Sequence, residues 1–503
     1  MTRIHYTFRK ELKIGLCFLL LPFVSYTFNS CADDEGNYDY TDVNQLTISG
    51  IQDSYEVEQF SELIITPNIT GSKSFNESDY SYTWFIYKTN SKEVPDTVSH
   101  EKNLNISVAK APSSSYRLMF EVRENETGRV TYHRSEMSVI NTYSKGLAVL
   151  SEVEGMAKVA FINSLDHVTE DAYEAVNGRP AGRGPIGIFL AGRNSNSDQL
   201  IVISTEDSVM CCNNIDFSYV MNYQEMFYFP SSPGRLENVL HGRYPYKEYA
   251  IVDGCVYKRD IYVGSGATST LPKFPAKLAS QGKVSKYGFF NDNSQGYFYN
   301  TDKKCFVYDT YNDIGFLSSG YGNEYWDACN VGMDMIWGGC ALNDDNKTFI
   351  RTIMQDSNGK RYLLWGIKGN DYDPSTWDSW YYLIPSGKRE ITGDMAKTNV
   401  FTFSSLDVNY LYYGYGNKIT CVSVVTGNVI SETTVDGGNI DYMEFDPADN
   451  TKLYVGASDG SSRAKSGSVY VMQMTTNGQL TMQKSYKNIS GKVVDFETNT
   501  SDR

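Results

Sequence analysis

Short runs of aromatic and aliphatic residues, separated by Gly, Asn and Asp, recur over the last two thirds of the chain. Each unit has an apolar run, a turn and a second run, as in residues 249–257, 296–308, 410–419 and 452–456. Runs this short, bounded by turn residues, are typical of strands rather than helices. The 39 Tyr, 24 Phe and 41 Gly among 503 residues agree with this interpretation. We therefore predict an all-β fold.

The repeated units indicate a C-terminal β-propeller over residues 145–503. Blades of roughly 40–50 residues would give about seven, and the weakness of the repeat leaves six or eight open. A propeller removes its exposed sheet edges by closing into a ring, commonly through a strand from one end of the chain. Residues 492–497 (Lys-Val-Val-Asp-Phe-Glu) are the candidate for that closing strand.

Residues 44–142 predict a smaller, separate sandwich. Its alternating strand-like runs are 46–48, 61–67, 80–87, 104–108, 116–122 and 130–140. Strands at this spacing, with a Trp in a central one, are what an immunoglobulin-like sandwich requires. Trp84 is that residue, and we expect its ring in the core rather than on a ligand.

The first 30 residues have the pattern of an export signal. A basic start is followed by the uncharged, largely apolar run 14–28, which is shorter than the roughly 20 residues that span a bilayer. Cys31 follows Ser30 at the expected cleavage point, and a thiol is the group to which a diacylglycerol is attached. Phe28 and Asn29 depart from the usual residues before such a Cys. We predict a signal peptide over 1–30, lipidation of Cys31 and an acidic spacer over 31–43.

The stretch Cys31-Ala32-Asp33-Asp34-Glu35-Gly36-Asn37-Tyr38-Asp39-Tyr40 resembles the start of the PKD-like family lipoproteins of Bacteroidota. The run Tyr82-Thr83-Trp84, followed by Tyr116 and Thr127-Gly128, resembles the PKD module itself. Acidic residues directly after the lipidated Cys imply export to the outer face of the outer membrane, with Asp33, Asp34 and Glu35 as the signal. The resemblance also implies a place beside a nutrient-uptake system. The alternative is that these acidic residues form a disordered spacer and do not act as a targeting signal.

Charge and motifs exclude several classes of function. The formal net charge is −15, and the predicted leader contributes about +3, which argues against nucleic-acid binding. Beyond Cys17 and Cys31 there are seven Cys without CxxC spacing, and the His residues are isolated, so we expect no metal and no cofactor. The string Gly456-Ala457-Ser458-Asp459-Gly460 lacks the strand–turn–helix context of a catalytic elbow. We find no catalytic motif and expect a non-enzyme.

Tryptophans cluster between residues 326 and 380 and give the candidate ligand site. Trp337 and Trp365 lie in strand-like runs and are expected to fill blade interfaces. The others lie in turn-rich stretches, where binding residues concentrate. Exposed rings with neighbouring carboxylates stack on sugars and accept hydrogen bonds from their hydroxyls. The candidate ligand-binding residues are Tyr325, Trp326, Asp327, Trp377 and Trp380.

The export signal, together with what the resemblance implies, predicts a lipid-anchored outer-membrane protein that faces the cell exterior. Its expected function is non-catalytic capture of a glycan or peptide for an outer-membrane transporter complex. A propeller-fold hydrolase with carboxylates in an axial pocket is the first alternative. A structural scaffold docked on the transporter is the second.

Overall fold

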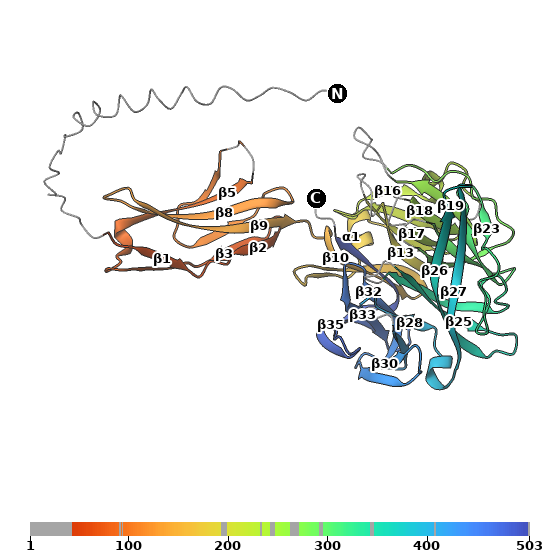
Figure 1. The fold of residues 1–503 in the computed structure, drawn as a ribbon. Coiled ribbons are helices and arrows are strands. Elements are labelled where there is room, and N and C mark those ends of the chain that lie inside the picture. Colours follow the sequence, from red (N-terminus) through yellow and green to blue (C-terminus); the bar gives the residue numbers. More distant parts are fainter. Residues whose placement is uncertain are drawn as a thin grey trace, which may run out of the picture.

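The computed structural model describes residues 43–89, 92, 94–192, 199–231, 234–241, 247–261, 271–290, 295–342, 347–406 and 409–500. Figure 1 shows two β-rich parts, a sandwich in red to orange and a ring of sheets in yellow to blue. The predicted fold class is confirmed: an all-β chain with an N-terminal sandwich followed by a propeller.

The sandwich pairs a five-stranded sheet, in the order β2-β9-β8-β5-β6, with two strand pairs, β1-β4 and β3-β7. Its elements are β1 (Leu46–Ser49), β2 (Ser54–Glu58), β3 (Glu62–Ile65), β4 (Asn68–Gly71), η1 (Glu77–Asp79), β5 (Tyr80–Lys88), β6 (Asp96–Ser99), β7 (Leu104–Ser107), β8 (Ser113–Glu124) and β9 (Val130–Ile140). Trp84 is fully buried between the layers and its ring stacks on Phe120, with centroids 4.4 Å apart. The predicted core position of Trp84 is confirmed.

Among its described residues, the C-terminal part forms seven sheets, which we number as blades 1 to 7. Blade 1 contains β10 (Lys145–Val153), β11 (Met156–Asn163), β12 (Val168–Thr169) and β36 (Lys492–Thr500). Blade 2 contains β13 (Pro185–Ala191), β14 (Leu200–Thr205), β15 (Val209–Asn213) and β16 (Tyr219–Asn222). Blade 3 contains β17 (Leu236–His241), β18 (Lys247–Val252) and β19 (Cys255–Asp260). Blade 4 contains β20 (Val284–Phe289), β21 (Tyr297–Asn300), β22 (Cys305–Asp309) and β23 (Ile314–Phe316).

The remaining blades follow the same order along the chain. Blade 5 contains β24 (Asp334–Leu342), β25 (Thr348–Gln355), β26 (Arg361–Asp373) and β27 (Asp378–Ile391). Blade 6 contains β28 (Val400–Thr402), β29 (Tyr410–Tyr415), β30 (Lys418–Ser423) and β31 (Val429–Thr434). Blade 7 contains β32 (Asn439–Asp446), β33 (Asp449–Ser458), β34 (Gly467–Met474) and β35 (Leu480–Ser490). Short helices are α1 (Ala172–Asn177), α2 (Tyr223–Met226) and η2 (Gly393–Ala396).

The C-terminal strand β36 closes the ring. It pairs antiparallel with β10, with Leu147 opposite Thr498 and Val149 opposite Phe496, and so completes blade 1. It also contacts the first strands of the two flanking blades, β13 and β32. The predicted closing strand is confirmed, and the ring has no unpaired end at this point.

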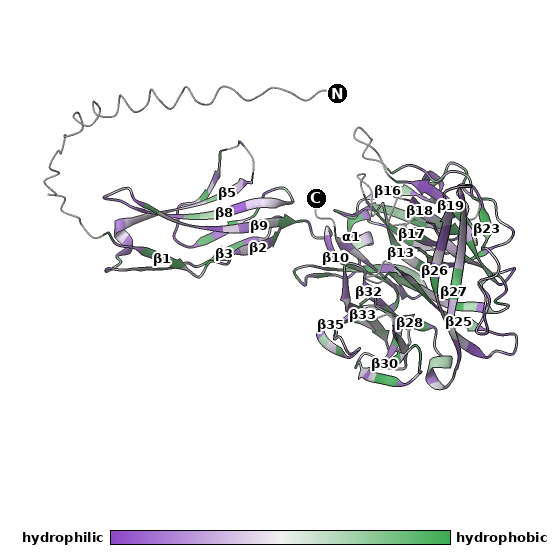
Figure 2. Ribbon diagram, in the orientation of Figure 1, coloured by the Kyte–Doolittle hydropathy of each residue, from purple (hydrophilic) through white to green (hydrophobic). Residues whose placement is uncertain are grey.

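One apolar cluster fills each interface between neighbouring blades. Blades 1 and 2 share Leu150 and Ile188, for example, and blades 7 and 1 share Tyr454 and Phe496. Further clusters join the other neighbours in turn around the ring. Because each blade packs on both faces, its central strands are apolar on both sides. Figure 2 shows green stretches, among white and purple ones, on strands of both parts of the molecule.

Polar contacts join the sandwich to the propeller. The ammonium of Lys145 lies 2.8 Å from Glu56 Oε2, and His167 Nδ1 lies 3.1 Å from Glu58 Oε2. Burial acts to raise the pKa of Glu56, but hydrogen bonds with Lys145 and Ser164 and the charge of Lys145 together outweigh burial, and the pKa is lowered. Within the described ranges, we find no helix with the length and apolar character needed to cross a membrane.

Candidate functional site

The predicted lipidation and export residues, Cys31, Asp33, Asp34 and Glu35, lie outside the described residues. The predicted ligand-binding residues lie in blade 5 and in the segment that precedes it. Their placement divides them into two groups, one on an exposed hairpin and one beneath it.

Trp377 and Trp380 lie at the far end of the β26–β27 hairpin. Trp377 is 80% exposed and has φ +61°, in the left-handed region that bulky residues rarely adopt. Trp380 is opposite Asp371 in the strand register and remains 39% exposed. The hairpin therefore presents two indole rings and a carboxylate to solvent, as the sequence predicts for this stretch.

Trp326 does not join that surface. Its ring is 7% exposed and lies in the core shared by blades 4 and 5, and its Nε1 donates a 3.1 Å hydrogen bond to the carbonyl of Gly387. Tyr325 is 45% exposed beside it, and the Asp327 carboxylate accepts from the backbone N–H of Cys329 at 2.9 Å. A single aromatic face of Trp326, Trp377 and Trp380 is therefore absent from the described structure.

Trp337 and Trp365 pack against the apolar cluster between blades 5 and 6. Their predicted role as interface residues is confirmed. All seven cysteines of the described residues are free thiols, and burial raises the pKa of Cys211 to about 12. No cluster of three metal-ligating side chains occurs in the part of the chain that the structure describes.

Carboxylates near the propeller axis bind the backbone of a neighbouring strand. Asp495 Oδ2 accepts from the N–H of Ile188 at 3.0 Å, and Glu497 Oε2 accepts from the N–H of Leu190 at 2.8 Å. Both acids lie on β36 and both N–H groups lie on β13, the first strand of blade 2. Neither acid is among the lining residues of the pockets that this structure has between blades 7 and 1 and between blades 3 and 4. The two side chains therefore join blade 1 to blade 2 through these hydrogen bonds.

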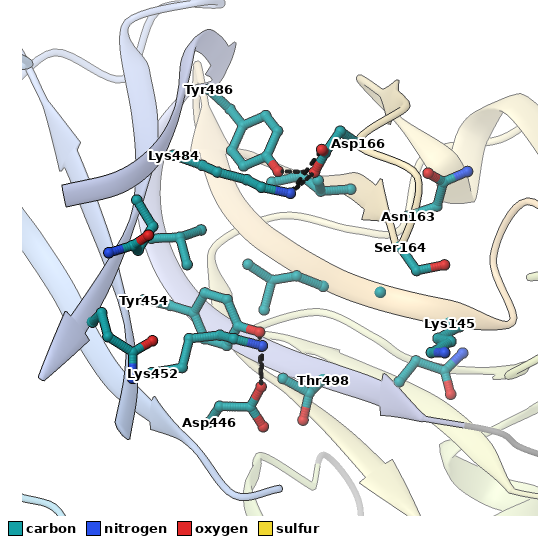
Figure 3. A pocket seen from close by; sticks show the side chains of 17 residues that line it. Lys145, Asn163, Ser164, Asp166, Asp446, Lys452, Tyr454, Lys484, Tyr486 and Thr498 are labelled. Atoms are coloured by element: carbon teal, nitrogen blue, oxygen red, sulfur yellow. Dashed lines mark hydrogen bonds and ion pairs between the residues drawn. The ribbon is translucent and has the colours of Figure 1, made fainter. Parts of the chain in front are cut away.

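A pocket of about 350 Å³ lies between blade 7 and blade 1, and we call it the closing-blade pocket. Its lining residues are Lys145, Gly146, Leu147, Ile162, Asn163, Ser164, Asp166, Asp446, Lys452, Tyr454, Val471, Gln473, Gln483, Lys484, Tyr486, Thr498 and Asn499. They come from β10, β11, β36 and the segment after β11 on one side, and from β32 to β35 on the other. Figure 3 shows the pocket with polar groups around an apolar centre.

Two similar groups of Tyr, Asp and Lys stand in the walls of this pocket. In the first, Asp166 accepts from the hydroxyl of Tyr486 at 2.5 Å and from Lys484 at 2.7 Å. In the second, Asp446 accepts from the hydroxyl of Tyr454 at 2.9 Å, with Lys452 at 3.5 Å. Figure 3 shows both groups, with dashed lines at Asp166 and at Asp446.

The charges of these groups are largely compensated within the pocket. Burial acts to raise the pKa of Asp166, but hydrogen bonds from Lys484 and Tyr486 outweigh it, so the pKa falls below its usual value. Burial and the adjacent Asp446 raise the pKa of Tyr454, so its hydroxyl stays protonated as a donor at neutral pH. The pocket thus offers donors and acceptors on paired, oriented groups around the apolar side chains of Leu147, Ile162 and Val471.

The chain matches the model of the PKD-like family over residues 31–185. That range includes the sandwich and the first strands of the propeller, so the PKD-like part of the predicted resemblance is confirmed there. Among curated proteins, none matches this sequence.

Solved structures resemble the chain at low identity. A quinonprotein alcohol dehydrogenase-like protein from Bacteroides thetaiotaomicron VPI-5482 is 12% identical with a TM-score of 0.36, over 90% of this chain and 97% of that one. The C-terminal WD40 domain of Sif2 is 8% identical with a TM-score of 0.36, over 63% of this chain and 93% of its own.

Proposed function

We propose that this protein is a lipid-anchored, non-catalytic binding protein on the outer face of the outer membrane. It captures a glycan in the closing-blade pocket and presents it to an outer-membrane transporter. The lipid at Cys31 would hold the chain at the membrane, and the sandwich would act as a spacer between the membrane and the propeller. Anchoring by two or more acyl chains is durable, whereas a single chain gives marginal attachment.

The observation that carries the proposal is the pair of Tyr–Asp–Lys groups across one pocket. A sugar presents hydroxyls at its edge and C–H groups on its faces, so it needs oriented polar partners around an apolar surface. Asp166 and Asp446 supply acceptors, Lys484 and Lys452 supply donors, and Leu147 adds apolar surface. A pocket of about 350 Å³ lies in the range of small-molecule sites, which fits one or two sugar rings.

Capture without catalysis is favoured over hydrolysis because of where the carboxylates lie. Hydrolysis of a glycosidic bond requires two carboxyl groups free to act on either side of it. In the closing-blade pocket each carboxylate already accepts from a Lys and a Tyr, and at the axis Asp495 and Glu497 hold backbone N–H groups.

The test is an oligosaccharide array probed with the chain from residue 31 onward, followed by calorimetry on the best neutral hit. Gln483→Ala removes an exposed amide at the rim of the pocket and should weaken binding about tenfold without loss of fold. The matched control is Gln479→Ala, an exposed glutamine in the preceding turn that does not line the pocket. An array without any signal, or equal affinity of both variants, would contradict the proposal.

The anchor is tested separately. Cys31→Ala should release the protein from the outer-membrane fraction, while the intact protein stays with it and is cleaved by protease added to whole cells. Retention of the Cys31→Ala variant in the outer membrane would exclude lipidation at this residue.

A further inference from the structure

A second pocket, of about 400 Å³, lies between blades 3 and 4, and we call it the lysine pocket. Lys247 and Arg259 lie on adjacent strands of blade 3, Lys273 comes from the connection to blade 4, and Tyr311 comes from the turn between β22 and β23. Four cationic side chains in one pocket contrast with a chain whose net charge is −15.

Two of the cations are already paired with buried carboxylates. Arg259 forms an ion pair with Glu248, and Lys258 lies 2.9 Å from Asp309 Oδ2; both carboxylates are fully buried behind the pocket. Asp309 also accepts from the hydroxyl of Tyr249 at 2.8 Å. These pairs fix the wall of the pocket. Among the described lining residues, the other charged side chains are those of Lys247, Lys273 and Asp260.

Unlike Arg259 and Lys258, Lys247 is not paired with a carboxylate in the described part of the chain. It is 6% exposed, and in the described ranges its ammonium makes no hydrogen bond and no ion pair. Asp260 is its partner in the strand register, yet the two side chains form no salt bridge. Burial and the neighbouring Lys258 lower the pKa of Lys247, as expected for an ammonium whose charge is incompletely compensated. A buried cation in this state is costly unless an anion reaches it.

Tyr311 provides an aromatic surface beside that cation. Its ring centroid lies 4.8 Å from the Lys247 ammonium and 4.9 Å from that of Lys258, and the residue is 64% exposed. Its φ of +89° lies where non-glycine residues are rare, at a cost of roughly 1–3 kcal/mol. The exposed ring therefore lies beside both ammonium groups at the pocket, where a bound molecule can also contact it.

We propose that the lysine pocket binds the anionic group of an acidic saccharide, with Lys247 facing the charge and Tyr311 lying against the sugar ring. Carboxylate and sulfate groups are both suited to an ammonium, and the C–H face of a pyranose is suited to a tyrosine ring. This inference rests on the proposed glycan capture and extends it to a second site. The second site lies between blades 3 and 4, whereas the closing-blade pocket lies between blades 7 and 1. The two sites have different lining residues, so they are separable by mutation.

The test is calorimetry of the full mature chain with four probes: a galacturonate oligosaccharide, a sulfated oligosaccharide, a neutral oligosaccharide and sodium sulfate. We expect at least one acidic oligosaccharide to bind, with affinity that falls as NaCl is raised. The carboxylate and sulfate probes distinguish the two sources of charge. Binding of the neutral probe alone would overturn this inference and leave the proposed function in place.

Two variants locate the binding. Lys247→Met keeps the length and packing of the side chain but removes its charge, and it should weaken acidic-saccharide binding about tenfold or more. Tyr311→Gly suits the positive φ, should keep the fold, and should weaken the same binding. The control Lys418→Met, at a half-buried lysine of blade 6 far from the lysine pocket in chain order, and the rim variant Gln483→Ala should leave it unchanged. Equal affinity of wild type, Lys247→Met and Tyr311→Gly for every acidic probe would overturn the inference.

Discussion

Asp495 in the closing strand accepts a 3.0 Å hydrogen bond from the backbone N–H of Ile188 in the first strand of blade 2. The two residues are more than 300 positions apart in the chain, and their contact joins the C-terminal strand to the blade beyond the one it completes. Burial raises the pKa of Asp495 to about 7, because desolvation outweighs the hydrogen bond from Ile188. An unfolded aspartate titrates near 3.9.

This shift predicts how stability depends on pH. Between about pH 4 and pH 7 the native state binds a proton at Asp495 that the unfolded state has lost, so this residue makes the free energy of unfolding fall as pH rises. Asp495→Asn keeps an acceptor for Ile188 and removes the charge. It should be more stable than wild type at pH 8 and little changed at pH 4.5, as measured by urea unfolding.

The control for this prediction is Asp378→Asn, an exposed aspartate at the start of β27. Its unfolding should follow wild type at both pH values. A stability difference between Asp495→Asn and wild type that is the same at pH 4.5 and pH 8 would exclude a titrating Asp495.

Phe496 tests whether ring closure holds the propeller together. Its ring is 3% exposed and packs edge-to-face on Tyr442 of blade 7, with centroids 5.6 Å apart. Phe496→Ala should lower the free energy of unfolding by about 3–5 kcal/mol, because it leaves a cavity at the seam of the ring. Val429→Ala, at a 56% exposed position of blade 6, should change it by less than about 0.5 kcal/mol. If both variants lowered the free energy of unfolding by a similar amount, packing at the junction of blades 7 and 1 would not be a main source of stability.

The two tryptophan environments predict opposite results. Trp326→Ala should cost about 3–5 kcal/mol of unfolding free energy, because the ring fills the core and its N–H is satisfied by Gly387. Trp377→Gly removes an exposed ring from a position with positive φ and should change stability by no more than about 1 kcal/mol. Thermal and urea unfolding of both variants would show whether the hairpin tip is structural; a large loss in Trp377→Gly would show that it is.

Much of the architecture follows from local pattern in the sequence. The run 492–497 combines apolar Val493 and Phe496 with a terminal position, which is enough to predict a closing strand. The strands β2, β4 and β6 are absent from the sequence prediction, because they are four or five residues long and largely polar or partly exposed. Pairing with β9, β1 and β5, rather than their own composition, holds β2, β4 and β6 in their sheets.

The site residues follow less readily from the sequence. Trp326 lies in a turn-rich stretch that predicts exposure, but its ring turns inward to a carbonyl 61 positions later in the chain. The closing-blade pocket brings Asp166 against Lys484, 318 positions away. Sequence motifs relate residues that are close together in the chain, so they do not predict a contact at this separation. The available signal was the recurrence of Tyr, Lys and Asp on neighbouring strands of one blade, as in Lys452, Tyr454 and Asp446.

A crystal structure of the mature chain bound to the neutral oligosaccharide with the strongest array signal would show directly whether the closing-blade pocket binds a glycan. We expect a sugar ring between the Asp166 and Asp446 groups, with its hydroxyls within hydrogen-bond distance of Lys484, Lys452 or Gln483. A saccharide bound instead against Trp377 and Trp380, with the closing-blade pocket holding only water, would contradict it.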